Sequence, residues 1–348
     1  MTVILVDGFD PYNGTGANTG IQARWTVSST TNISMVAGRF TGQAVQIVGA
    51  TAAPNCKVTL PSTYASFAMG MAIKSTSIPT SATLNPILIF ESAGTTQVGI
   101  RVTTGGLLEA YRLTSTTAGT SLGTSSSGLT VNTWHYVEVE VTISDTVGVF
   151  NIYIDGVSVL ALTAQDTRNG APTTIDTFRF GHHNTGVGST GGTFLYDDLY
   201  MVDAATKLGE RRVEYCAPTA DTAQKDFTPN AGGTNYTQVD EAQSNGDTDY
   251  VQASTVGNTD RYTHGGLSST PATVDAVQVV AFAEKTDATA RSIALQVKSG
   301  STTSDGSNLT LAASYGRFGR LLLTDPDTAA AWTPSGVNNL AFGPKVTV

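Results

Sequence analysis

The chain has few charges, few cysteines and no long hydrophobic run. Only 14% of its 348 residues are charged, and 28 acidic against 19 basic residues give a formal net charge of −9. Phosphate binding needs clustered Lys and Arg, so nucleic acid is not an expected partner. No stretch approaches the length that spans a membrane, and residues 1–6 are too short for the hydrophobic region of a signal peptide. We therefore expect neither nucleic-acid binding nor membrane insertion.

Cysteine and histidine are also scarce. Cys56 and Cys216 are the only cysteines, and no second pair is present to build a zinc site. We expect two reduced thiols in different parts of the fold, with a Cys56–Cys216 disulfide as the alternative. His182 and His183 are adjacent, and neighbours on an extended strand point to opposite faces, so one shared metal ion is not expected.

Short strand-like runs separated by turn signals fill most of the chain. Val137, Val139 and Val141 alternate with polar residues, which is the period of a half-buried strand. Asp155 and Gly156 supply the residues with positive φ that a tight hairpin requires. The only helix signal lies at residues 332–340, where Thr333 can cap and Pro334 can occupy the first helical position. The sequence predicts an all-β protein of two β-sandwich domains.

The domain boundaries follow from a change of pattern after residue 203. We expect a first domain over residues 1–204, a linker and connecting strand over 205–216, and a second sandwich over 217–348 that docks to a partner.

Four segments carry a resemblance to a known fold. Residues 5–10 read LVDGFD, 134–139 read WHYVEV, 153–157 read YIDGV, and 193–202 read TFLYDDLYMV. This order resembles the concanavalin A-like, laminin-G-like jelly roll, which implies that the first and last strands pair and close the sandwich.

The second half also carries a resemblance. Residues 239–242 (VDEA), 249–251 (DYV), 331–333 (AWT) and 343–346 (GPKV) resemble a β-sandwich of structural proteins in tailed phages and prophages. There the unit follows a laminin-G-like domain, so the resemblance covers nearly the whole chain. It implies a virion protein, made in the host cytoplasm, whose partners are other virion proteins.

Acidic residues from both ends of the first domain suggest a structural ion. Paired first and last strands would bring Asp7, Asp10, Asp197 and Asp198 to one edge. Similar jelly rolls hold a structural Ca²⁺ there through oxygen ligands. We therefore predict Asp10 and Asp198 as metal ligands, with turn capping by solvated carboxylates as the alternative.

Glu138 and Glu140 resemble the paired carboxylates of laminarinase-like glycan hydrolases, which share the jelly roll. Residues i and i+2 of a strand share a face, as retaining hydrolysis requires. Tyr136 and Thr142 occupy the next positions on that face, so the third acid of those enzymes is absent. We expect the two glutamates to face solvent, and we predict no catalytic residues.

From these observations we predict that the chain is a non-enzymatic virion protein of the phage tail or fibre apparatus. Its jelly roll would present a surface to host glycans, through residues that the sequence does not identify, and it would assemble as a homo-oligomer, with a trimer favoured. The first alternative is a decoration protein of the capsid or tail tube, and the second is a laminarinase-like glycan hydrolase.

Overall fold

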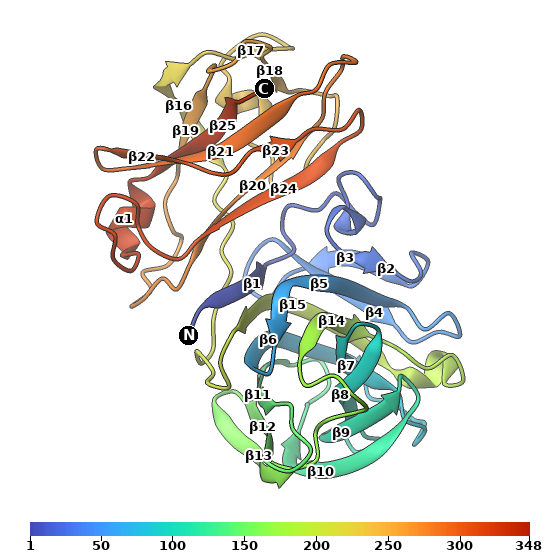
Figure 1. Cartoon of the computed structure of the whole chain (residues 1–348). Coiled ribbons are helices and arrows are strands. Elements are labelled where there is room, and N and C mark those ends of the chain that lie inside the picture. Colours follow the sequence, from blue (N-terminus) through green and yellow to red (C-terminus); the bar gives the residue numbers. More distant parts are fainter. The chain divides into compact units, whose positions relative to one another are not determined.

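The structure is a computed structural model that describes residues 1–348, and nearly all of its regular elements are strands (Figure 1). The predicted all-β fold class is confirmed. The chain forms two compact units: Met1–Phe9 with Arg24–Val213, and Asp10–Ala23 with Glu214–Val348. Sequence analysis did not predict that Asp10–Ala23 belongs with the second unit. No helix is long and apolar enough to cross a membrane.

The first unit contains two antiparallel sheets. The eight-stranded sheet has the order β13-β12-β11-β6-β15-β4-β3, with β1 also paired to β15. Its strands are β1 (Val3–Asp7), β3 (Ile33–Ala37), β4 (Gln43–Val48), β6 (Ser66–Ser77), β11 (Trp134–Thr142), β12 (Gly148–Ile154), β13 (Val157–Gln165) and β15 (Thr193–Val202).

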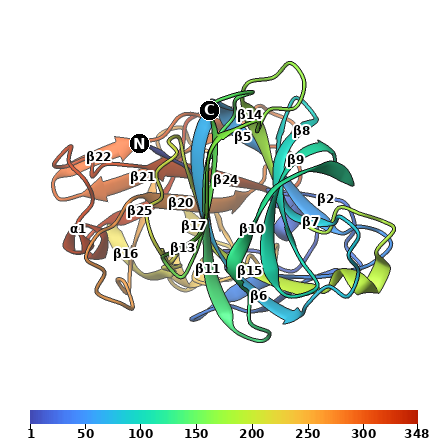
Figure 2. The same cartoon turned by 90° about the horizontal axis from the view of Figure 1, so that it is seen from below.

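The seven-stranded sheet has the order β10-β9-β8-β7-β14-β5-β2. Its strands are β2 (Thr26–Val27), β5 (Asn55–Tyr64), β7 (Pro86–Ser92), β8 (Thr95–Val102), β9 (Leu107–Ser115), β10 (Ala118–Gly128) and β14 (Ile175–Gly181). Figure 2 shows β8, β9 and β10 beside one another.

Aromatic side chains join the two sheets. The ring of Phe67 on β6 lies 4.7 Å from that of Phe90 on β7, and the rings of Phe180 on β14 and Tyr196 on β15 are 4.9 Å apart. All four residues are fully buried. Contacts of this kind across a sandwich combine a large buried apolar area with favourable ring geometry.

The predicted closure of the jelly roll is confirmed. Strand β1 pairs antiparallel with β15, so that Asp7 stands opposite Leu199. The predicted hairpin is also present: Asp155 and Gly156 have φ values of 50° and 80° between β12 and β13. Both positions need the left-handed conformation that Asp and Gly tolerate best in two-residue turns.

The second unit is a separate arrangement of strands. One sheet has the order β16-β19-β25-β21-β22, with β23 paired to β21, and two ribbons are formed by β17 with β18 and by β20 with β24. The strands are β16 (Pro218–Lys225), β17 (Thr228–Pro229), β18 (Val251–Gln252), β19 (Asp260–His264), β20 (Val277–Ala283), β21 (Ser292–Ser299), β22 (Thr302–Asp305), β23 (Leu309–Thr310), β24 (Gly316–Leu322) and β25 (Ala341–Val346).

The core of the second unit lies between the β20–β24 ribbon and β21. Val279 and Leu322 of the ribbon pack with Leu295 and with Trp332, all of them buried. The predicted helix is confirmed as α1 (Pro334–Asn338), with the Thr333 side chain accepting a hydrogen bond from the backbone of Gly336. Three short 3-10 turns complete the elements: η1 (Ile21–Ala23), η2 (Gly188–Gly191) and η3 (Tyr236–Gln238).

Candidate functional site

A row of paired residues crosses the outward face of the seven-stranded sheet. Phe90 and Phe178 point into the core, where their rings lie 5.3 Å apart. Strand neighbours alternate between faces, so Ile89 and Arg179 point outward. The register continues this row through Lys57, Arg179, Ile89, Gly99, Tyr111 and Ser121. With strands about 4.8 Å apart, the row is roughly 24 Å long; Lys57 and Arg179 at one end are part-exposed, and Ser121 at the other end is exposed.

The centre of this row is apolar. Ile89 and Leu113 are fully buried, Tyr111 is 8% exposed, and Leu84 packs against them. An added Cβ at Gly99 would lie 2.7 Å from the Leu113 side chain, so that side chain occupies the space above Gly99. These residues form a closed apolar floor.

One end of the row carries a buried acid between two cations. The Glu91 carboxylate is 1% exposed, with its Oε2 atom 2.9 Å from Arg179 Nη2 and 4.0 Å from Lys57 Nζ. Burial raises the pKa of Glu91 above its usual range, although the two cations act to lower it and nearby Asp176 adds to the rise. The Lys57 and Arg179 side chains are 33% and 22% exposed, so both cations are open to solvent.

The other end carries a hydrogen-bonded acid. Arg101 contacts the Glu109 carboxylate through Nε at 2.7 Å, and the Ser121 hydroxyl donates to its other oxygen at 2.6 Å. Burial acts to raise the pKa of Glu109, but hydrogen bonds from Ser121 and Arg101 hold it below its usual range. Glu109 therefore remains charged and paired with Arg101. At the opposite end of the row, Lys57 lies farther from its acid, at 4.0 Å from Glu91.

Two histidines follow the row at the end of β14. His183 Nδ1 lies 2.8 Å from the Pro86 carbonyl oxygen and donates to it, while its Nε2 atom is buried without a hydrogen-bond partner. Burial, with a smaller contribution from Arg179, lowers the pKa of His183 to about 3. His183 is therefore neutral and presents an acceptor nitrogen. His182 Nδ1 instead contacts the Asn85 side-chain amide at 2.8 Å, so the two rings have different partners.

The structure places the predicted metal ligands in different units, Asp10 in the second and Asp198 in the first. Asp198 accepts a hydrogen bond from the Val213 backbone at 2.8 Å, and its Oδ2 atom lies 3.6 Å from Arg39 Nη1. A guanidinium stands where a cation would need to bind, and no group of three or more His, Cys, Asp or Glu residues could hold a metal ion. The surroundings of Asp198 do not fit Ca²⁺, and calcium binding by this pair stays a prediction that the geometry does not support.

The other acids of the predicted edge are engaged by protein donors. Asp7 accepts hydrogen bonds from the indole of Trp25 at 2.9 Å and from Arg24 at 3.0 Å. Asp197 accepts one from the Arg39 backbone at 2.7 Å. These carboxylates hold loops against the sheet.

Glu138 and Glu140 share one face of β11; the expectation that they face solvent is wrong for Glu138, and Glu140 is half-buried. Glu138 is fully buried, accepts a hydrogen bond from Tyr200 at 2.6 Å and contacts Lys207 Nζ at 3.2 Å. Glu140 accepts a hydrogen bond from the Lys207 backbone at 3.1 Å. Residues 204–213, here called the strap, lie over this face through Lys207 and Leu208, so Glu138 is inaccessible and Glu140 is half-buried.

The two cysteines are not joined by a disulfide: Cys56 is buried in the first unit, and Cys216 is partly buried in the second, where its thiol contacts the Gly266 carbonyl oxygen. Burial raises the pKa of Cys56 above its usual range, and the charge of Asp7 adds to the rise. Cys56 is therefore a protonated core residue without nucleophilic character.

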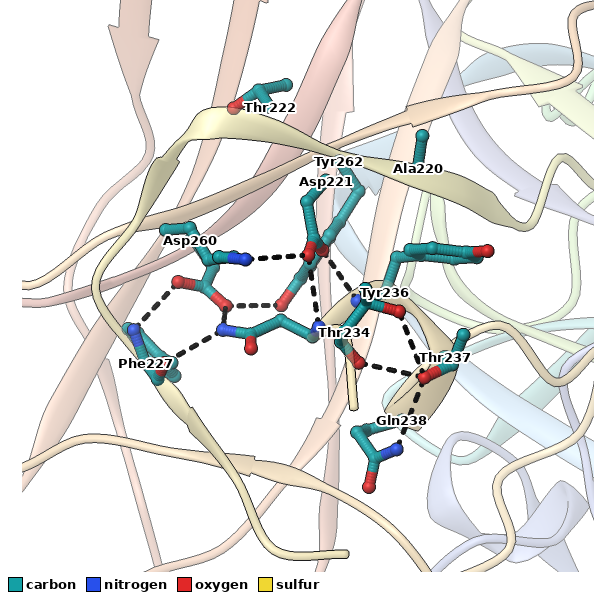
Figure 3. A network of polar contacts seen from close by, with 12 residues as sticks. Ala220, Asp221, Thr222, Phe227, Thr234, Tyr236, Thr237, Gln238, Asp260 and Tyr262 are labelled. Atoms are coloured by element: carbon teal, nitrogen blue, oxygen red, sulfur yellow. Dashed lines mark hydrogen bonds and ion pairs between the residues drawn. The ribbon is translucent and has the colours of Figure 1, made fainter. Parts of the chain in front are cut away.

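The second unit contains a network of polar contacts around Asp260, drawn in Figure 3. Asp260 is fully buried and accepts hydrogen bonds from the Phe227 backbone (2.8 Å), the Asn235 side chain (2.7 Å) and the Tyr262 hydroxyl (2.8 Å). Asp221 accepts from the backbone of Tyr236 at 2.7 Å. Because protein donors occupy the Asp260 carboxylate, this network fixes the loop that contains η3.

Sequence reasoning did not identify Lys57, Glu91, Arg179 or His183 as site residues. They come from β5, β7 and β14 and meet only through strand pairing. One signal was available: Arg179 stands between two phenylalanines, so a charge alternates with two core residues. That pattern places the charge on the outward face.

No protein-family model and no curated protein matches the chain. Similar solved structures include an endo-β-1,4-glucuronan lyase from Trichoderma reesei (14% identity, TM-score 0.42, covering 56% of this chain and 98% of that one). They also include the alginate lyase Aly36B (15%, 0.40, 61% and 100%) and the carbohydrate-binding module CBM66 from Bacillus subtilis (13%, 0.32, 50% and 92%). These are carbohydrate-active or carbohydrate-binding proteins.

These similarities correct one prediction. Two of the three structures are polysaccharide lyases, so the prediction that this chain is not an enzyme is withdrawn. At these identities and TM-scores, the likeness transfers none of their activities to this chain.

Proposed function

We propose that this chain is a glycan-recognition protein of a phage particle, located on its outer surface in the tail or fibre apparatus. The outward face of the seven-stranded sheet would be the recognition surface, and the second unit would dock to other virion proteins. The sequence resemblance supports the phage assignment, and the sheet face supports glycan recognition.

The observation that carries the proposal is the row from Lys57 to Ser121. It combines a largely buried apolar floor with charged and hydroxyl groups at its two ends. Sugars present apolar C–H faces together with hydroxyl groups, and sites of this mixed character hold small ligands in protein clefts. A row of roughly 24 Å also suits an extended chain of sugars.

A glycan array with purified protein tests the recognition surface. Tyr111→Ala removes part of the floor and should weaken binding of any recognised glycan about tenfold, which corresponds to about 1.4 kcal/mol. Phe40→Ala is the control, since Phe40 is a 54%-exposed aromatic in the loop between β3 and β4 of the other sheet. Equal losses in both variants, with unchanged melting temperatures, would remove the sheet face from the proposal.

Imaging of intact particles tests the location. Density at the tail tip or in fibres, in trimers with the first unit facing outward, would support the proposal. A regular lattice of this chain over the capsid or tail tube, without glycan binding, would identify a decoration protein instead.

A further inference from the structure

The cations at the Glu91 end of the row are poorly engaged within the protein. Arg179 Nη2 pairs with Glu91 Oε2 at 2.9 Å, whereas Arg179 Nε is buried and has no hydrogen-bond partner. Lys57 Nζ, at 4.0 Å, is beyond hydrogen-bond distance of Glu91. A guanidinium carries five donors and an ammonium three, so this end has donors in excess of the acceptors that Glu91 provides.

An unpartnered acceptor lies farther along the chain, just beyond the end of β14. His183 Nε2 is buried and unpartnered, and His183 is 6% exposed. Its Nδ1–H group is fixed on the Pro86 carbonyl, so the free nitrogen can only accept. Buried polar atoms are rarely left without partners, and such a group in a native fold needs an explanation.

We propose that the Lys57–Arg179 end of this face binds a carboxylate of an acidic glycan, and that the ligand class is glycans bearing carboxylates. This inference rests on the proposed function. Arg179 and Lys57 would receive the ligand carboxylate. Glu91 holds the two cations in place when no ligand is bound and competes with the ligand for them.

The chemistry of the donors favours a carboxylate over a neutral sugar. The planar fork of a guanidinium matches the two oxygens of a carboxylate, and hydrogen bonds between charged partners are roughly twice as strong as neutral ones. Both cations are part-exposed while Glu91 is 1% exposed, so the donors face solvent and the competing acid lies beneath them.

The test compares each glycan bound on the array with its carboxyl-reduced form, in which the acid is replaced by an alcohol on the same sugar skeleton. Reduction should weaken binding at least tenfold, and raising NaCl from 50 to 500 mM should weaken only the acidic form. Lys57→Met should weaken the acidic form about tenfold. Lys74→Met, which removes a lysine from β6 of the other sheet, is the matched control and should have no effect. Glu91→Gln removes the competing charge and should tighten binding severalfold.

The outcomes separate the two proposals. Equal binding of acidic and reduced glycans, or equal effects of Lys57→Met and Lys74→Met, would overturn the carboxylate site and leave glycan recognition standing. Failure to bind any glycan would overturn the proposed function itself, and the carboxylate site with it. Because the Lys57 side chain is one-third exposed, its replacement reports on binding without loss of the core.

Discussion

Replacing Lys207 by methionine should destabilise the first unit strongly. Lys207 Nζ lies 3.2 Å from Glu138 Oε2, and Glu138 is fully buried beneath the strap. The substitution keeps most of the aliphatic stem but leaves the Glu138 carboxylate with Tyr200 as its remaining hydrogen-bond partner. A buried charge without a counter-charge is costly because the low-dielectric interior does not solvate it.

The magnitude follows from the burial of the two partners. Removing one member of a buried ion pair costs about 3–5 kcal/mol, whereas exposed pairs are worth about 0–1 kcal/mol. The Lys207 side chain is 22% exposed, so part of its charge is screened and the lower end applies, about 3 kcal/mol. For a unit of this size, each kcal/mol lowers the melting temperature by about 2–4 °C, which gives a decrease of about 6–12 °C.

Thermal unfolding of a double-mutant cycle measures this effect. Glu138→Gln keeps an acceptor for Tyr200 and removes the charge, so the double variant with Lys207→Met should recover to within about 1 kcal/mol of the native protein. A loss below about 0.5 kcal/mol for Lys207→Met alone would refute the reasoning, since the pair would then behave like a surface pair.

Three further substitutions give separate tests. Burial raises the pKa of Asp198 to about 6, against hydrogen bonding from the strap and the nearby Arg39, and its ordinary value is 3.8. The native state therefore binds the proton more tightly than the unfolded chain, so the charged form costs stability above pH 6 and this cost disappears as pH falls toward 4. Raising this pKa from 3.8 to about 6 corresponds to at most about 3 kcal/mol of stability. Asp198→Asn should flatten the curve of melting temperature against pH between 4 and 8; parallel curves would contradict this. Asp260→Ala removes the acceptor of three hydrogen bonds and should cost the second unit at least about 3 kcal/mol in urea unfolding, and a loss under 1 kcal/mol would show that water replaces it. Thr333→Ala removes the cap of α1 and should cost about 1 kcal/mol, whereas Thr333→Ser should cost little.

Local rules predicted the features that local sequence determines. The alternation of Val137, Val139 and Val141 placed these residues in the core, and all three are fully buried. The Asp155–Gly156 turn and the Thr333 cap depend on residues within one turn of each other. In each case the interacting groups are close together in the chain, so a short stretch of sequence is enough to predict the interaction.

The predictions that the structure changed depend on contacts between distant segments. The polar alternation of β11 indicated an exposed face for Glu138, but the strap arrives from more than sixty residues away in the chain and buries it. The group of Lys57, Glu91 and Arg179 forms only after three strands pair. Periodicity tells which residues share a face of a strand, and it contains no information on which other segment covers that face.

The difference between the two outward faces explains why recognition is assigned to the seven-stranded sheet. On the eight-stranded sheet, polar groups of β11 and β15 already bind the strap. Lys207 contacts the Glu138 carboxylate, and the Leu208 backbone donates a hydrogen bond to the Tyr200 hydroxyl at 2.8 Å. A ligand there would have to displace hydrogen bonds that are already made. On the seven-stranded sheet, Arg179 and Lys57 are part-exposed and their donors are not all used. A ligand at this second face would compete only with Glu91 for the two cations, so binding is favoured there even though both faces carry acids, tyrosines and basic residues.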